Sequence, residues 1–257
     1  MKWPNSVTLI RHDTSAYNVL RDKKKDDPLY KRYLAARKRD DNSEEARDLA
    51  RQVQKQFSLG VSDADTPLAD VEGRQGFEVG TALASFHEQP DAIFVSPYKR
   101  ALMTLEHVTR GWPDLRPVKI YRDDRVREQE HGLALLYNDW KVFETLHPEQ
   151  RELRKLEGSY WYRYPQGENV PDVRERNRSW LTTLTRDFAG KRVLVVTHHL
   201  NILAVRANLE RFDATEFIRL DEKDKPINCG VTLYLGKPDK GKDGKLELEF
   251  YNKRYYR

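Results

Sequence analysis

Six short apolar runs, rich in β-branched residues, recur along the chain and predict six strands. They span 7–12, 92–97, 118–123, 193–198, 231–236 and 246–252. The fourth run, VLVVTH, is apolar at successive positions, which is typical of a central strand covered on both faces. Between the runs, apolar residues recur at helical spacing, as in 173–188. Strands that alternate with helices predict an α/β fold in three layers, an α/β/α sandwich.

A charged segment at about 21–60 follows the first predicted strand, and its pattern predicts a helical insert. An apolar stripe at helical spacing is formed by Ala46, Leu49, Ala50, Val53 and Phe57. Asn42 followed by Glu45 resembles a capping box at the start of this helix. A shorter helix is expected around 29–39, paired with the first. We therefore expect a single domain over 1–257 that contains this basic insert.

Charge is concentrated in the insert. The chain has 257 residues and a net charge of +5. The stretch 21–55 holds twelve Lys or Arg against eight Asp or Glu, which gives +4 of that total. A basic segment can attract nucleic acid. Here acids are interleaved with the bases, and Tyr30, Tyr33 and Phe57 fit helix faces better than a stacking platform. A solvated helical pair is therefore favoured over nucleic-acid binding.

Cysteine content and hydropathy indicate the cellular compartment in which the protein is expected. Cys229 is the single cysteine, which excludes an intrachain disulfide framework and a thiolate metal cluster. The N-terminal stretch has no apolar segment of signal-peptide length, and no run approaches a membrane span. We expect a soluble, cytoplasmic protein with no membrane partner. A homodimer is left open.

Four polar segments stand at the ends of predicted strands. They are RHDTSAYN at 11–18, SPYKRA at 96–101, REQEHG at 127–132 and VVTHHLN at 195–201. In open α/β sheets, ligands bind outside the carboxyl ends of the strands. The four segments are therefore expected to converge on one site.

Phosphoryl transfer is the chemistry that these residue types could perform together. A neutral imidazole such as His12 can attack phosphorus and form a phosphohistidine. Two guanidiniums, Arg11 and Arg100, match phosphate oxygens bidentately, and His198 adds a second imidazole donor. Glu128 can protonate the leaving alkoxide. No carboxylate cluster of the kind that Mg²⁺ prefers stands near these motifs, so neither a metal nor a cofactor is expected.

The same segments resemble the histidine phosphatase superfamily, also called phosphoglycerate mutase-like. Its signature is Arg-His-Gly with an Asn six residues after the His, then Ser-Pro-x-x-Arg-Ala, a Glu before a Gly, and a late His after a hydrophobic strand. Order and spacing match here, including Asn18 six residues after His12. The resemblance extends to 66–80, 160–173 and 226–234, and is nearest to phosphatase-like members of the first branch. It implies a mostly parallel central sheet with the helical insert after the first strand.

The resemblance also implies roles for individual residues. His12 would be the nucleophile and Glu128 the general acid. The residues that would line the phosphate pocket are Arg11, Asn18, Arg100 and His198. Further candidates for binding the substrate are Asp13, Ser15 and His199. The implied activity is a metal-independent phosphomonoesterase that hydrolyses a small phosphorylated metabolite through a phosphohistidine on His12.

Two positions depart from the family pattern. Glycine usually follows each of the two histidines, whereas Asp13 and His199 stand there in this chain. A carboxylate beside a phosphate pocket should repel a dianion. One hypothesis is that Asp13 and His199 face each other and pair. The other is that both side chains point away and only the loop dihedrals differ.

Several other polar residues are expected to play structural roles. Glu168 and Asp172 are expected to cap and orient the helix that follows them. His131 is read as a surface or pocket-wall residue. Surface positions are also expected for His87, His107 and His147.

Two alternative functions remain. A phosphoglycerate mutase is one, although the segment after Gly132 lacks the basic signature expected of a mutase. A non-hydrolytic module that binds a phosphorylated ligand is the other. In the binding module, the basic insert would be the docking surface. In the enzyme, the insert is expected to decide substrate choice, because a lid over the phosphate site, with lysines and arginines reaching inward, would suit a substrate with a second anionic group.

Overall fold

The computed structural model describes residues 2–257, and its strands form one six-stranded sheet in the order β3-β2-β4-β1-β5-β6. Strands β1 to β4 run parallel to one another, whereas β5 is antiparallel to β1 and β6 is antiparallel to β5. The strands are β1 (Ser6–Arg11), β2 (Ala92–Val95), β3 (Ile120–Arg122), β4 (Arg192–Thr197), β5 (Val231–Lys237) and β6 (Lys245–Lys253). All six predicted strands are present, each within two residues of its predicted ends, and the mostly parallel α/β fold is confirmed.

Ten α-helices and three short 3₁₀ turns are found in residues 2–257. The helices are α1 (Ala16–Asp26), α2 (Pro28–Arg39), α3 (Glu44–Gln56), α4 (Arg74–Phe86), α5 (Lys99–Gly111), α6 (Trp140–Leu146), α7 (Pro148–Glu157), α8 (Val170–Asp187), α9 (His199–Glu210) and α10 (Ala214–Lys223). The turns are η1 (Pro113–Leu115), η2 (Asp124–Val126) and η3 (Gly132–Tyr137). Over this part of the chain, no helix is at once long enough and apolar enough to cross a membrane.

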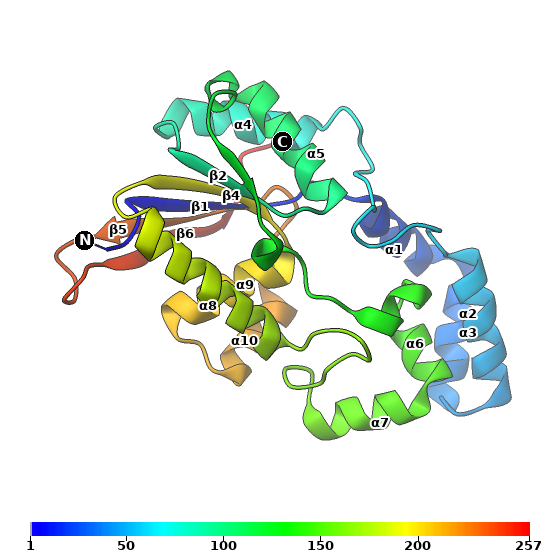
Figure 1. Cartoon of the computed structure of the whole chain (residues 1–257). Coiled ribbons are helices and arrows are strands. Elements are labelled where there is room, and N and C mark those ends of the chain that lie inside the picture. Colours follow the sequence, from blue (N-terminus) through cyan, green and yellow to red (C-terminus); the bar gives the residue numbers. More distant parts are fainter. Residues whose placement is uncertain (1) are drawn as a thin grey trace.

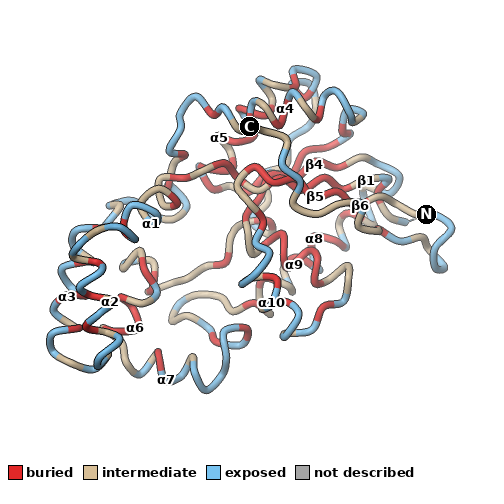
Figure 2. Tube along the Cα trace, turned by 180° about the vertical axis from the view of Figure 1, so that it is seen from behind, coloured by how far each residue is buried: buried red, intermediate tan, exposed pale blue. Residues whose placement is uncertain are grey.

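Helices cover both faces of the sheet. Successive side chains of a strand point to opposite faces, and β4 shows this alternation. Val193 and Val195 belong to the core beneath α8 and α9, whereas Leu194 and Val196 pack with residues of α4 and α5. Figure 1 shows α4 and α5 on one side of the sheet and α8, α9 and α10 on the other. In the view from behind, buried positions concentrate between these layers (Figure 2).

The register of the parallel strands brings three polar residues to one edge. Arg11, the last residue of β1, lies opposite Thr197, the last residue of β4. Val95, the last residue of β2, lies opposite Val196. The residues that follow these strands are His12, Ser96 and His198, so all three emerge side by side at the carboxyl edge of the sheet.

The insert forms a lobe beside the sheet. The predicted stripe on α3 is buried and packs with tyrosines of α2 and with Val142 of α6. Figure 1 shows α2 and α3 next to α6, beyond the end of α1. The expected helix around 29–39 is α2. The capping box expected at Asn42 is wrong: the cap is Ser43, whose Oγ accepts from the backbone N–H of Ala46.

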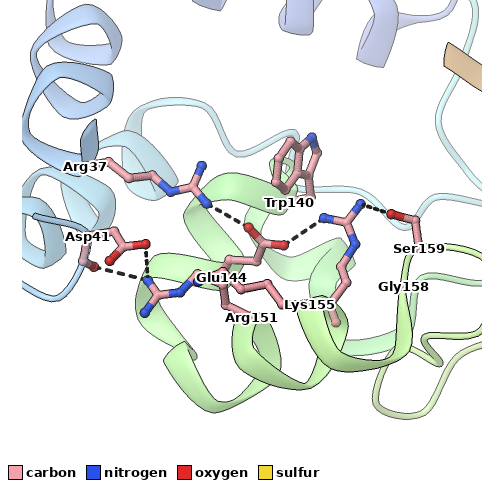
Figure 3. Close-up of a pocket in the computed structure, with 9 residues that line it drawn as sticks. Arg37, Asp41, Trp140, Glu144, Arg151, Lys155, Gly158 and Ser159 are labelled. Carbon is pink, nitrogen blue, oxygen red and sulfur yellow. Dashed lines mark hydrogen bonds and ion pairs between the residues drawn. The ribbon is translucent and has the colours of Figure 1, made fainter. Parts of the chain in front are cut away.

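Ion pairs tie the insert to α6 and α7. Glu144 accepts from Arg37 on one oxygen, at 2.7 Å, and from Arg154 on the other, at 2.8 Å. Arg151 reaches Asp41 at 2.7 Å, and these side chains surround a hollow of about 400 Å³ (Figure 3). Arg37 of α2 therefore binds a carboxylate within the lobe. The expectation that the basic residues of the insert reach over the phosphate site as a lid is wrong for Arg37, which pairs with Glu144.

Truncation of the α3 stripe should destabilise the protein. Leu49 is buried against α2 and α6, so Leu49→Ala leaves a cavity and should lower the free energy of unfolding by about 2–5 kcal/mol. Urea denaturation followed by circular dichroism measures this loss. Gln52→Ala, at an exposed position of the same helix, is the matched control and should change stability by about 0.5 kcal/mol or less. Equal effects of the two substitutions would show that the stripe is not a packed core.

Candidate active site

Two buried imidazoles face each other at the carboxyl edge of the sheet. The ring centroids of His12 and His198 lie 5.1 Å apart. Nδ1 of His12 is 2.6 Å from the main-chain oxygen of Asp13. A carbonyl oxygen can only accept a hydrogen bond, so Nδ1 carries the proton. Nε2 of His12 is then left with a free lone pair, which is the form that a nucleophile requires.

The surroundings keep both rings neutral. Burial, together with the positive charges of Arg100 and Arg11, holds the pKa of His12 well below its ordinary value. Burial and the positive charges of Arg100 and Arg11 also lower the pKa of His198, and the neighbouring His12 adds to this lowering. Both imidazoles are therefore uncharged at neutral pH.

His198 is held by residues of the loop after β2. Its Nε2 lies 2.7 Å from Oγ of Ser96, and its ring meets that of Tyr98 edge-on at 5.2 Å. Nδ1 of His198 is buried, and nothing within residues 2–257 pairs with it. Ser96 and Tyr98 were not among the predicted site residues. The only signal for them was their place in the Ser-Pro-x-x-Arg-Ala segment at a strand end.

The two arginines differ in how they are held. Arg11 donates from Nη1 to the main-chain oxygen of Pro226 at 2.7 Å, while its buried Nε has no partner in the described chain. Burial lowers the pKa of Arg11 to about 10. Arg100, in the first turn of α5, donates to the carboxylate and the main-chain oxygen of Asp63. Both guanidiniums lie close enough to the histidines to shift their pKa values.

Asn18 and Ser15 form the cap of α1. Oδ1 of Asn18 accepts from the backbone N–H and the hydroxyl of Ser15, both at 3.0 Å. Asn228 donates from Nδ2 to the same Oδ1 and to the main-chain oxygen of His12. The hydroxyl of Ser15 is thus used in the cap rather than turned toward a ligand, while Nδ2 of Asn18 takes no part in these bonds. Asn228 links the cap to the histidine, and sequence reasoning missed it.

Glu128 approaches the site from the loop after β3. Its Oε1 accepts from the backbone N–H of Leu200, near the start of α9, at 3.1 Å. Its charge raises the pKa of Arg11 against the lowering effect of burial, so the two groups lie near each other. The predicted general acid is therefore half-buried beside the arginine that precedes the predicted nucleophile.

Arg176 and Glu168 hold the loop that carries Glu128. Arg176 donates to main-chain oxygens of this loop, including that of Glu128 at 2.9 Å. Glu168 pairs with Arg176 at 3.0 Å and accepts from the backbone N–H of Glu130. The capping role expected for Glu168 is therefore wrong. The one expected for Asp172 is confirmed, because it completes a capping box with Asn169.

A close backbone crossing brings Glu168 beneath this loop. A Cβ on Gly167 would lie 2.5 Å from the main-chain oxygen of Glu130, and one on Gly132 would lie 2.1 Å from that of Pro165. Gly132 also has φ of +49°, which disfavours other residues. Glycine at both positions is therefore a requirement of the loop geometry.

Asp13 and His199 do not pair with each other. The carboxylate of Asp13 accepts from the backbone N–H groups of Thr14 and Gly76, at the start of α4. His199 turns toward α10, where Nε2 lies 2.7 Å from Oδ1 of Asp221. The pairing hypothesis is wrong because each side chain finds a partner on a different helix. Burial raises the pKa of Asp13, and the two amides only partly oppose this rise.

One histidine was placed wrongly by sequence reasoning. His107 is buried rather than at the surface, because α4 passes so close that a Cβ on Gly73 would overlap its ring. His87 and His147 are partly exposed.

The assembled donors suit an oxyanion. Within residues 2–257, no three His, Cys, Asp or Glu side chains come together in a way that could hold a metal ion. The groups that converge instead are two guanidiniums and two buried imidazoles, one of which has a free Nδ1. Charge-assisted and bidentate bonds of this kind are strongest to phosphate or carboxylate oxygens.

Comparison with known proteins identifies the family. The model of the histidine phosphatase superfamily (branch 1) matches residues 49–241, a span that begins after Arg11 and His12. A phosphoglycerate mutase-like protein of Arabidopsis thaliana is 26% identical over 228 residues, which cover 85% of this chain and 70% of that protein. The chain belongs to the histidine phosphatase superfamily, branch 1.

Solved structures share the fold over nearly the whole chain. A mycobacterial glucosyl-3-phosphoglycerate phosphatase in complex with inorganic phosphate superposes with a TM-score of 0.63 at 17% identity, covering 98% of both chains. A phosphoserine phosphatase of Entamoeba histolytica in complex with 3-phosphoglyceric acid gives a TM-score of 0.61 at 18% identity, covering 96% of both. The phosphoglycerate mutase-like fold is thus confirmed.

The buried imidazoles should make stability depend on pH. The folded-state pKa of His12 lies below that of the unfolded chain, about 6.5. As the pH falls below 6.5, the unfolded chain therefore takes up a proton that the folded chain does not. The free energy of unfolding should decrease by up to about 1.4 kcal/mol per pH unit for this group. Urea denaturation at pH 7.5, 6.5 and 5.5 measures the slope.

The variant His12→Gln isolates this contribution. It removes one titrating imidazole and leaves the carboxylates of the chain unchanged, so its stability should fall less steeply over the same pH range. Parallel slopes for the native protein and the variant would contradict a neutral, buried His12.

Proposed function

We propose that this protein is a metal-independent phosphomonoesterase that acts on a small phosphorylated metabolite through a phosphohistidine on His12. The observation that carries the proposal is the hydrogen bond from Nδ1 of His12 to the main-chain oxygen of Asp13. It leaves Nε2 as a neutral nucleophile beside two guanidiniums. The family supports a phosphatase, and two of the proteins that share the fold are a glucosyl-3-phosphoglycerate phosphatase and a phosphoserine phosphatase.

In the first step, Nε2 of His12 attacks phosphorus and the bond to the ester oxygen breaks. Arg11, Arg100 and Nδ2 of Asn18 hold the three non-bridging oxygens as negative charge spreads over them. Nδ1 of His198 joins them if Oγ of Ser96 donates its proton to Nε2, because Nδ1 then carries the hydrogen. In this site, Nε of Arg11 and Nδ1 of His198 are buried without a partner in the described chain, and a bound phosphoryl oxygen would satisfy them.

Glu128 supplies and recovers one proton. Its carboxyl group protonates the leaving alkoxide in the first step. In the second step the carboxylate accepts a proton from water, which attacks the phosphohistidine, and the P–N bond breaks to release inorganic phosphate. The bonds from Leu200 and Arg176 to this segment keep Glu128 near the ester oxygen. All charge stabilisation comes from side chains of this chain, so no metal is needed.

Hydrolysis of p-nitrophenyl phosphate in excess EDTA tests the proposal. The native protein should turn over the substrate despite the chelator, because the positive charge comes from Arg11 and Arg100. His12→Ala removes the nucleophile and should lower kcat by at least about 10³-fold. His87→Ala, at the partly exposed position that follows the last residue of α4, is the matched control and should keep native activity.

Each other outcome counts against the proposal. Activity that disappears with EDTA and returns with a divalent metal contradicts metal independence. No turnover by the native protein contradicts a phosphomonoesterase and favours the mutase or the binding module, which phosphoglycerates and ³²P labelling of His12 then distinguish.

The assignment of Glu128 as the general acid predicts a dependence on the leaving group. Glu128→Gln should lower kcat/KM for glycerol 2-phosphate, whose alkoxide must be protonated, by about 10²–10⁴-fold. The loss for p-nitrophenyl phosphate should be much smaller, because p-nitrophenolate leaves without a proton. Steady-state rates for both substrates give this ratio.

Glu130→Gln is the matched control, since Glu130 lies two residues further along the same loop and its side chain bonds to the hydroxyl of Tyr98. The ratio of the two substrates should be unchanged in this variant. A leaving-group effect in Glu130→Gln and not in Glu128→Gln would show that Glu130 is the acid and that the assignment to Glu128 is wrong.

A further inference from the structure

The carboxylate of Asp63 is bonded to the guanidinium of Arg100, which the proposed mechanism assigns to the phosphoryl oxygens. Nη1 of Arg100 donates to Oδ1 of Asp63 at 2.9 Å, and Nη2 donates to Oδ2 at 3.3 Å. Nη1 also donates to the main-chain oxygen of Asp63 at 2.6 Å. The Arg100 side chain is only 6% exposed and that of Asp63 20%. This two-oxygen contact has the geometry that a guanidinium forms with phosphate as well as with carboxylate.

We propose that the carboxylate of Asp63 is an internal anion that occupies the phosphate-binding end of Arg100 and is displaced when a phosphoryl dianion binds. Asp63 is then a residue that sets the affinity of the site for phosphate. This inference rests on the proposed function in one respect, because it takes Arg100 as a ligand of the phosphoryl group.

The charges around the two neutral imidazoles support displacement. Without a ligand, Arg100 faces Asp63, whose carboxylate cancels its positive charge. A dianion that enters the site gains little from Arg100 as long as this carboxylate stays in place. When the carboxylate of Asp63 moves out to solvent, the same site has a net positive charge.

The loop is built so that the carboxylate can move while the backbone stays in place. The backbone N–H of Lys99 donates to the main-chain oxygen of Ala64 at 2.8 Å, and the hydroxyl of Thr66 donates to that of Ser62 at 3.0 Å. These bonds hold both sides of Asp63. The main-chain oxygen of Asp63 therefore continues to orient Nη1 of Arg100, and rotation about χ1 alone releases the carboxylate.

Little packing opposes that rotation. The side chains of 58–65 are exposed or half-buried, and a Cβ on Gly60 would meet nothing within 4 Å. Segments with few buried contacts open at low cost in free energy. Asp63 thus combines a buried partner on one side with open solvent on the other.

Binding of inorganic phosphate tests the proposal without depending on turnover. Isothermal titration calorimetry at pH 7.5 compares the native protein with Asp63→Asn and Asp63→Ala. Both variants remove the competing charge, so the dissociation constant for phosphate should fall by at least about fivefold. In an Arg100→Met background, Asp63→Asn should have no effect, because the shared partner is absent.

Asp65→Asn is the matched control. Asp65 lies on the same loop, is exposed and bonds to the hydroxyl of Ser62. Its substitution should leave the dissociation constant unchanged, which separates the local contact from the general effect of removing a negative charge.

Phosphate binding that is unchanged in both Asp63 variants overturns the proposal. Weaker binding in both also overturns it, and shows that Asp63 positions Arg100 for the phosphoryl group. Turnover of p-nitrophenyl phosphate separates this result from the proposed function. If the native protein hydrolyses the ester but the Asp63 variants do not bind phosphate more tightly, only the inference about Asp63 is overturned. If the variants bind phosphate more tightly but the native protein hydrolyses nothing, only the proposed phosphatase activity is overturned.

Discussion

The burial of two imidazoles beside two guanidiniums is the constraint on which the rest of the site depends. A protonated imidazole would place a third positive charge in a buried site, so His12 and His198 stay neutral. Neutrality alone does not choose which nitrogen is free. The main-chain oxygen of Asp13 makes that choice for His12 by taking the proton of Nδ1. A backbone carbonyl thus fixes the tautomer that the proposed nucleophile requires.

Backbone contacts also hold the groups around this pair. Arg176 fixes the Glu128 loop through main-chain oxygens, and Asn228 joins the oxygen of His12 to the cap of α1. Leu200 donates its N–H to the carboxylate of Glu128. These contacts use main-chain atoms of the loops, so they depend on the path of the backbone and not on the side chains of the loop residues. Removal of Arg176 would therefore disturb Glu128 without touching the reacting atoms.

The insert shows how far sequence patterns reach. Its two helices and the apolar stripe on α3 follow from periodicity, because a helix must bury one face. The location of the insert does not follow from periodicity, because an apolar stripe shows that one helix face is buried but not which element covers it. The partner is α6, almost a hundred residues away, and Glu144 there accepts from Arg37. Arg37, one of the basic residues that suggested a lid over the phosphate, is instead paired within the lobe.

The sequence by itself determined the strands, the main helices and the segments whose ends would carry the chemistry. Those features are local, because hydrophobic period and strand-end polarity are set by neighbouring residues. It also indicated Arg11, His12, Arg100, Glu128 and His198 through the order and spacing of their motifs. Only the tertiary structure decided the partners: Asp13 with Gly76, His199 with Asp221 and Arg100 with Asp63. Each of these contacts joins residues from 22 to 63 positions apart, and such pairs are chosen by how helices and loops pack rather than by any pattern along the chain.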